Sequence, residues 1–209
     1  MAKGKLPILI TPRSNAAYSW LAKKDTKFDK EGTYKVTCVI DKENPGPGRT
    51  NFGNTEVSGE DWIAGLLALC KEHGVASKVG AEGCPIKDGD DLKDKEGNPK
   101  PEFAGKYLIT FKTGYTPSLI DTKGNALPSS VPIYSGDIIK VAFQPQVREV
   151  KGTSYMSTYI HKVMLIEKTT GNSDMFGEEE GYEVSRQDAD NGGDTPDADF
   201  GDTGNDGDF

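Results

Sequence analysis

The sequence lacks any long hydrophobic run. It contains no stretch of about 18 consecutive apolar residues, so no transmembrane helix is predicted. The first residues, Met-Ala-Lys-Gly-Lys-Leu-Pro, do not include the apolar segment of a secretory signal peptide. We therefore expect a cytoplasmic protein without a membrane partner.

Cysteine and histidine are scarce, with three and two residues respectively. Cys38, Cys70 and Cys84 form no close pair, which argues against a disulfide framework and fits a reducing compartment. Cys70 and His73 have helical spacing and Cys84 could add a third zinc ligand, but no Cys-x-x-Cys pair is present, so buried core positions are favoured. The acidic run of residues 88–94 lacks the Gly and Glu of a calcium loop. We predict neither a metal nor a cofactor.

Enzymatic motifs are also missing. The Gly-rich stretch Pro45–Gly48 lacks the Gly-Lys-Ser/Thr ending of a phosphate loop. No spacing of residues assembles a nucleophile, a base and an orienting group. We predict a protein that is not an enzyme and has no catalytic residues.

Acidic residues, in contrast, are concentrated at the C-terminus. Residues 174–209 contain 13 Asp/Glu and one Arg, a net charge of −12, and they end in Phe209. Such an acidic, Gly-rich segment is predicted to be disordered. Its terminal Phe offers a partner one apolar anchor beside several charges, so we interpret Asp202, Asp206, Asp208 and Phe209 as partner-binding residues.

Residues 1–173 have the patterns of a single, mainly β domain. The chain has 25 Gly and 12 Pro, which favours a turn-rich fold. About five strands are predicted in this domain. A helix that is capped by Ser58 and ends at Gly74 precedes the last three strands. Residues 78–100 are charged and without periodicity, an irregular surface insertion. Alternation of apolar and polar residues is clearest over residues 33–40, 106–113, 138–144 and 155–167.

This order predicts an OB-fold five-stranded barrel with one interposed α-helix, a charged insertion and a disordered acidic tail. An aligned β-sandwich is the alternative.

The barrel part is basic and carries aromatic residues. Without residues 56–100, residues 1–173 have 18 basic and 10 acidic side chains. Positive charge along a groove, interleaved with aromatic rings on which bases stack, is typical of single-stranded nucleic-acid binding. The strand faces opposite the predicted core carry Lys35, Lys106, Lys112, Lys140, Tyr155 and Tyr159, and Phe52, Tyr115 and Tyr134 lie in or near turns.

Each of these residues also has an ordinary structural interpretation. A strand Tyr is often half-buried and a surface Lys often serves solubility. Trp62 lies on the apolar face of the predicted helix and is expected in the core. For Tyr18 and Trp20 the sequence leaves both interpretations open.

The chain resembles the replicative single-stranded DNA-binding proteins of tailed bacteriophages, the OB-fold kind with an acidic tail. The resemblance runs through most of the sequence and depends on the order of several short segments. These segments are Tyr18–Lys23, Gly32–Val36, Asp121–Gly124, Val131–Ile133 with Gly136, Val163–Glu167 and the ending Asp206–Phe209.

The resemblance implies an OB barrel that coats single strands in phage DNA replication, recombination and repair. It implies that the tail docks on the replication polymerase and the helicase-primase, helps to form a homodimer, and shields the protein's own DNA groove. By position, it implies DNA contacts at Lys3, Lys30 or Lys35, Lys112 and the region from Arg148 through Lys151 to Tyr155.

We therefore predict sequence-nonspecific binding of single-stranded DNA. One alternative is a structural or interaction protein whose acidic tail binds a basic partner without nucleic acid. Another is an RNA-binding OB module, which would differ in contacts to the 2′-hydroxyl.

Overall fold

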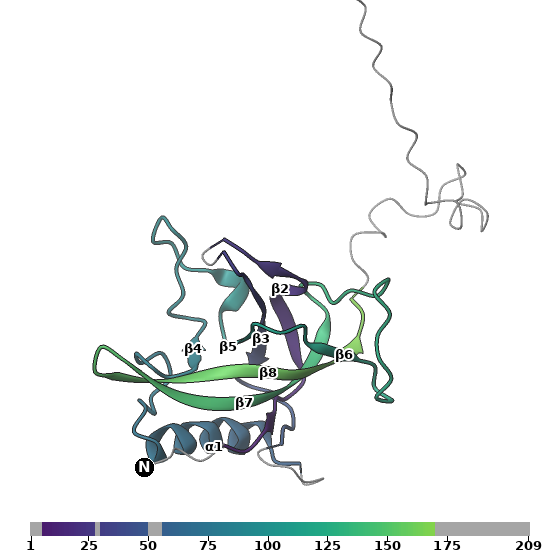
Figure 1. Cartoon of the computed structure of the whole chain (residues 1–209). Coiled ribbons are helices and arrows are strands. Elements are labelled where there is room, and N and C mark those ends of the chain that lie inside the picture. Colours follow the sequence, from purple (N-terminus) through teal and green to yellow (C-terminus); the bar gives the residue numbers. More distant parts are fainter. Residues whose placement is uncertain (1–5, 28–29, 50–55, 170–209) are drawn as a thin grey trace, which may run out of the picture. The chain divides into compact units, whose positions relative to one another are not determined.

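The structure is a computed structural model that describes residues 6–27, 30–49 and 56–169 (Figure 1). Lys3, Phe52 and the predicted partner-binding residues Asp202, Asp206, Asp208 and Phe209 lie outside these ranges. The predicted division of the chain at residue 173 stays a prediction.

The described residues form eight strands, one α-helix and one short 3₁₀ helix. In chain order they are β1 (Leu9–Ile10), β2 (Ser14–Asp25), β3 (Thr33–Asp41), α1 (Gly59–Glu72), β4 (Ile86–Asp88), η1 (Pro101–Phe103), β5 (Lys106–Thr113), β6 (Ser118–Ile120), β7 (Ile138–Val150) and β8 (Thr153–Glu167). No helix within these residues is long and apolar enough to cross a membrane.

Five of the strands close a ring. β2 pairs with β3, β3 with β5, β5 with β8, β8 with β7, and β7 again with β2. Four of these pairs are antiparallel, and β5–β8 is parallel. This circuit, with α1 placed before its last three strands, is consistent with the predicted OB-like architecture.

The sheet is nevertheless larger than the predicted five strands. β1 pairs with β7, β4 with β5 and β6 with β8, so the sheet has eight strands. The sequence pattern misses these additions because strands of two or three residues are too short to show an alternation. β4 also corrects the prediction that residues 78–100 are wholly irregular.

The predicted alternation on the ring strands is correct and defines the core. Val36, Cys38 and Ile40 of β3 and Ile109 and Phe111 of β5 are fully buried. β7 contributes its own inward positions, Ile139, Val141 and Phe143. The phenyl rings of Phe111 and Phe143 lie 4.7 Å apart between centroids, so side chains of β5 and β7, which are not paired, meet inside the ring.

The helix α1 packs its apolar face against this core. The backbone N–H of Asp61 donates to the Ser58 hydroxyl at 3.1 Å, which confirms the predicted cap. Trp62 is fully buried, as predicted, and its ring lies 6.3 Å from that of Phe143. The indole packs directly against the backbone of Gly48, where a Cβ would lie only 2.5 Å from Cδ1 of Trp62.

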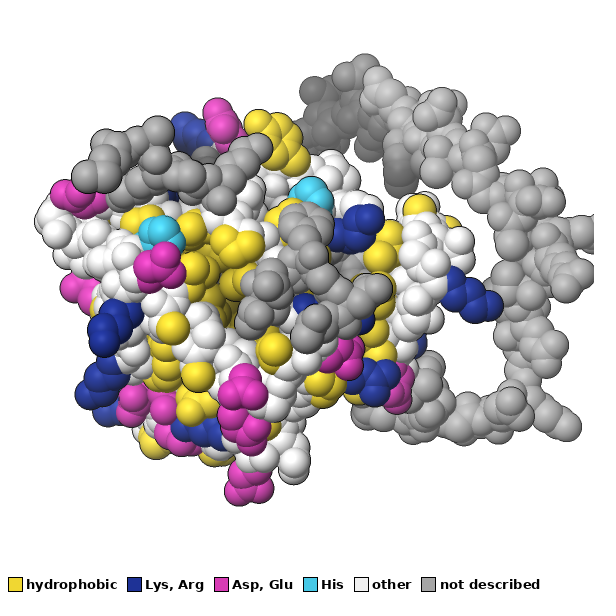
Figure 2. Space-filling model, turned by 90° about the horizontal axis from the view of Figure 1, so that it is seen from below, with side chains coloured by type: hydrophobic (Ala, Val, Ile, Leu, Met, Phe, Trp, Pro, Cys, Tyr) yellow, Lys and Arg dark blue, Asp and Glu magenta, His cyan; other side chains and the backbone are white. Residues whose placement is uncertain are grey.

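The outer side of α1 is mixed in character. Figure 2 shows hydrophobic side chains exposed between charged ones of both signs, in the view from the side of α1. The exposed charged residues of the helix are Glu60, Asp61, Lys71 and Glu72. α1 therefore does not present a continuous basic surface.

Substitution of Gly48 tests the packing of Trp62. Gly48→Ala forces a methyl group against the indole, and overpacking of this kind costs about 1–3 kcal/mol. In a domain of this size we expect the Tm to fall by roughly 2–12 °C. Thermal unfolding followed by circular dichroism measures the shift.

The matched control is Gly114→Ala, because a Cβ at Gly114 meets no atom within 4 Å. Its Tm should stay near that of the wild type. Equal Tm values for both variants would contradict the packing of Gly48 against Trp62.

Candidate nucleic-acid interface

One row of outward side chains crosses all five strands of the ring. The register pairs Trp20 of β2 with Lys35 of β3, Lys35 with Lys112 of β5, Lys112 with Tyr159 of β8, and Tyr159 with Gln144 of β7. Paired residues project on the same side of a sheet. The chain neighbours Leu21, Val36, Phe111 and Ile160 are buried, so the row faces outward. We call Trp20, Lys35, Lys112, Tyr159 and Gln144 the basic-aromatic row.

Both aromatic rings of the row lie beside a cation. The Nζ of Lys23 is 5.7 Å from the centroid of the Trp20 ring. The Arg148 guanidinium is 5.0 Å from the centroid of the Tyr159 ring. A flat ring with an adjacent positive charge suits a stacked base and its phosphate.

The two lysines of the row differ in their partners. Lys35 forms an ion pair with Asp25, whose side chain is almost buried. The hydrogen bond from Lys35 lowers the pKa of Asp25, so this carboxylate stays ionised at neutral pH. Lys112 is exposed and has no ion pair within the described residues. Lys112 is therefore the uncompensated charge at the centre of the row.

Two connections flank this face. Lys30 is exposed in the β2–β3 connection, and Lys151 is exposed in the β7–β8 turn. Lys151 and Gly152 have φ angles of 50° and 81°, as two-residue hairpins of the I′ type require. In OB folds the corresponding connections, together with the second and third strands, form the surface that binds oligonucleotides.

The other predicted residues lie apart from the row. Lys106 is at the far end of β5, in an ion pair with Asp41. Tyr155 donates its hydroxyl hydrogen to Glu82, which raises the pKa of Tyr155. Tyr115 is 86% exposed after β5. Tyr134 is 62% exposed and has the Nζ of Lys168 at 4.6 Å from its ring centroid.

Lys140 lies in a separate cavity of about 210 Å³. Arg49 and Lys162 contribute further positive charge to its wall, and Ile10, Ile120, Ala142 and Met164 supply apolar surface. The pKa of Lys140 is lowered, mainly because burial disfavours the charged ammonium. This cavity and the basic-aromatic row are thus built from different positions on β7 and β8.

Sequence reasoning missed part of the candidate interface. It left Tyr18 and Trp20 undecided, although the buried Leu21 beside Trp20 is an alternation signal that could have placed Trp20 outward. It did not find Lys100 and Phe103, which lie beside Tyr18. No local signal predicts that contact, because 82 residues separate Lys100 from Tyr18.

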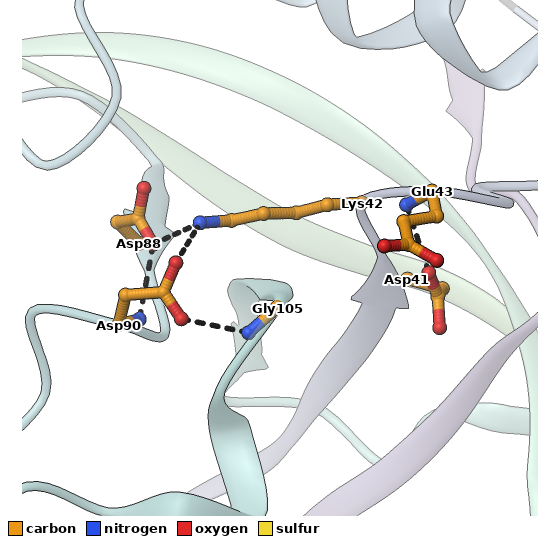
Figure 3. Close-up of polar contacts among 6 residues, drawn as sticks. All are labelled: Asp41, Lys42, Glu43, Asp88, Asp90 and Gly105. Atoms are coloured by element: carbon orange, nitrogen blue, oxygen red, sulfur yellow. Dashed lines mark hydrogen bonds and ion pairs between the residues drawn. The ribbon is translucent and has the colours of Figure 1, made fainter.

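Lys42, which follows β3, connects the charged insertion to this strand by ion pairs. Its ammonium bonds the carboxylates of both Asp88 and Asp90 (Figure 3). Asp90 also accepts the backbone N–H of Gly105 at 2.7 Å. Burial opposes the charge of Lys42, but the two carboxylates outweigh it and raise the pKa of Lys42. We call Lys42, Asp88 and Asp90 the insertion clamp.

The described residues contain no group of three or more His, Cys, Asp or Glu side chains that could hold a metal ion. The sulfur atoms of Cys70 and Met156 lie 3.6 Å apart in the core, where Cys70 is fully buried.

Comparison with solved structures identifies proteins of similar fold. The single-stranded DNA-binding protein from bacteriophage Enc34 in complex with ssDNA has a TM-score of 0.56 and 19% sequence identity, over 80% of this chain and 98% of that one. Its C-terminal truncation has a TM-score of 0.57 and 18% identity, over 81% and 98%. These likenesses show a shared fold.

A further match is gp2.5, a single-stranded DNA-binding protein encoded by bacteriophage T7, with a TM-score of 0.49 and 21% identity over 85% of this chain and 98% of that one. No protein-family profile and no curated protein sequence matches the chain. The two Enc34 structures are of a single-stranded DNA-binding protein, and at 18–19% identity the likeness to them concerns the fold.

Acid titration tests the insertion clamp. The hydrogen bond from Lys42 lowers the pKa of Asp90 below its value in the unfolded chain. A lowered carboxyl pKa stabilises the fold above the unfolded value of about 3.9, and this stabilisation is lost as the pH falls through the folded value. Asp90→Asn should therefore lower the Tm at neutral pH, and the difference from wild type should shrink below about pH 4 and vanish once the pH is below the lowered pKa of Asp90.

Asp91→Asn makes the same charge change at a neighbouring exposed position that has no ion pair within the described residues. Its Tm should follow that of the wild type at every pH. A similar loss in both variants would exclude a specific contribution of Asp90.

Proposed function

We propose that the protein is a replicative single-stranded DNA-binding protein of a tailed bacteriophage, built on an OB barrel. The observation that carries this proposal is the basic-aromatic row, because it crosses all five ring strands and places two lysines between two aromatic rings. The protein would bind single-stranded DNA without sequence preference, since base stacking and phosphate attraction do not distinguish between bases.

Each part of the row has a chemical role in this proposal. Trp20 and Tyr159 stack on bases, and each stacked base contributes about 1–3 kcal/mol. Lys112, Lys23 and Arg148 attract the phosphates beside those bases. Lys30 and Lys151 extend the positive surface at the two flanking connections. The fold of the Enc34 protein, which has been solved in complex with ssDNA, supports this assignment.

The biological context is part of the proposal. The protein would act on phage DNA in the cytoplasm of the infected bacterium, in replication, recombination and repair. Residues 174–209, with a net charge of −12, would compete with DNA for the basic surface. They would also dock the replication polymerase and helicase-primase, through Asp202, Asp206, Asp208 and Phe209, and support a homodimer.

A salt titration with oligo-dT tests DNA binding. The wild type should bind oligo-dT more tightly than duplex DNA or RNA of equal length, and its affinity should fall steeply with salt. Lys112→Gln should weaken binding and reduce the slope of log K against log salt by about 0.7, the value for one phosphate contact on a single strand. Fluorescence anisotropy at several salt concentrations gives both quantities.

Lys71→Gln removes an exposed lysine from α1 and serves as the control, with an unchanged slope expected. Preference for RNA would favour an RNA-binding module instead. No binding to any nucleic acid at low salt, even without residues 174–209, would favour an interaction protein.

Deletion of residues 174–209 tests competition by the acidic segment. A flexible chain of 36 residues spans about 30–36 Å, enough to cross the face of a small domain. The truncated protein should bind oligo-dT more tightly than the full chain and should cooperate less with the replication polymerase in strand synthesis. Equal or weaker DNA binding after truncation would contradict the competition.

A further inference from the structure

Tyr18 has an unusual backbone conformation beside the basic-aromatic row. Its φ angle is 50°, in the left-handed region that bulky residues rarely occupy. It lies at a β-bulge of β2, where the pairing with β3 shifts between Ala17 and Trp20. Its side chain is 48% exposed. Strained conformations of this kind persist where the surroundings impose them, and they cluster at binding sites.

The Tyr18 ring is held by Lys100, the last residue of the predicted insertion, and by Phe103, which follows it. The ring of Phe103, which is buried, lies 6.0 Å from it between centroids at an angle of 51°. The Nζ of Lys100 donates a hydrogen bond to the Tyr18 hydroxyl at 3.1 Å and lies 5.7 Å from the ring centroid. The ring is thus fixed by Phe103 and Lys100, and about half of its surface is open to a ligand.

The register places Tyr18 next to the basic-aromatic row on the outward face. Ala17 pairs with Thr37 and Trp20 pairs with Lys35, so the bulge lies between these two outward positions of β3. Thr37 is in turn hydrogen-bonded to Thr110 of β5 at 2.9 Å between the hydroxyl oxygens. Thr37 is buried and Thr110 is exposed, and both side chains are short. A strand that contacts Trp20 and Lys35 can continue to Tyr18 without an intervening large side chain.

At the far end of the same face the surface is closed. Leu108 pairs with Val39 on the outward side of β5, yet it is only 4% exposed. Lys106 and Asp41 form their ion pair beyond it. The outward face is therefore closed toward Lys106 and is accessible at the row, at Thr110 and at Tyr18.

We propose that Tyr18 and Lys100 form a second nucleotide subsite, in which Tyr18 stacks on a base and Lys100 holds the adjacent phosphate. This proposal rests on the proposed function and adds to it a role for the insertion. Lys100 supplies a permanent positive charge, since its hydrogen bond with Tyr18 raises its pKa. The acidic insertion, with Lys100 at its end, would then contribute a cation to the DNA surface.

A structural role for Tyr18 is the competing explanation, and a pair of variants separates the two. Tyr18→Ala and Tyr18→Gly both remove the ring, but Gly also relieves the left-handed conformation. We expect both variants to bind oligo-dT about tenfold more weakly, with an unchanged salt slope, as loss of one stacking contact predicts. The Tm of Tyr18→Gly should exceed that of Tyr18→Ala. Tyr18→Phe keeps the ring and should bind within about twofold of the wild type.

Lys100→Gln gives an independent readout that does not depend on the fold of the Tyr18 variants. Its salt slope should fall by about 0.7, as expected for one lost phosphate contact. Wild-type affinity in Tyr18→Gly and Tyr18→Ala, or an unchanged slope in Lys100→Gln, would overturn the subsite while leaving the proposed function intact. Failure of the wild type itself to bind oligo-dT would instead overturn the proposed function.

Discussion

The parallel pairing of β5 with β8 is the contact on which the rest of the structure depends. It is recorded at a single register position, Lys112 opposite Tyr159, and it closes the ring. The buried Thr158 hydroxyl donates to the carbonyl of Thr110 at 2.6 Å and reinforces the closure. Without this pair the sheet would keep its antiparallel neighbours, but Lys112 would no longer lie beside Tyr159. The same contact therefore completes the core and brings together the two halves of the basic-aromatic row.

The insertion is acidic in total, and yet it contributes the cation Lys100 beside Tyr18. Residues 56–100 have more acidic than basic side chains, which would repel a polyanion if all were free. Asp88 and Asp90 instead form ion pairs with Lys42 in the insertion clamp. The segment is thereby held against β3, and its last residue, Lys100, reaches Tyr18 on β2. Lys42 compensates one of these two negative charges, which reduces the repulsion that the acidic segment would exert on a polyanion.

Much of the fold could be predicted from local patterns. Strict alternation along β3 and β5 identified their buried faces, and Ser58 with Gly74 marked the ends of α1, because these signals depend on neighbours in the chain. The predicted strand 138–144 ended too early: β7 continues through Pro145 to Val150. Proline normally interrupts a strand because it has no N–H to donate. Pairing with β8 continues on both sides of Pro145, and no local pattern indicates this.

The candidate interface was less predictable than the fold for the same reason. Lys35, Lys112 and Tyr159 were placed on outward faces correctly, but their alignment in one row depends on the register between three strands. The partners of Lys35 and Lys106 were not predictable, since Asp25 and Asp41 are brought to them by tertiary pairing. The left-handed Tyr18 is a further case: the β-bulge shifts the alternation of β2 between the buried Ala16 and Leu21, but this shift does not indicate which residue takes the left-handed conformation.

The Asp25 carboxylate acts as an internal counterion of Lys35. Because Asp25 accompanies Lys35, in the proposed function the pair would approach a phosphate as a nearly neutral unit, and few of the cations condensed around that phosphate would be released. Lys112 has no such companion and would displace them. The number of ions released when a strand binds would therefore be smaller than the number of lysines that touch it. The same surface could remain attached at salt concentrations that detach a uniformly charged one.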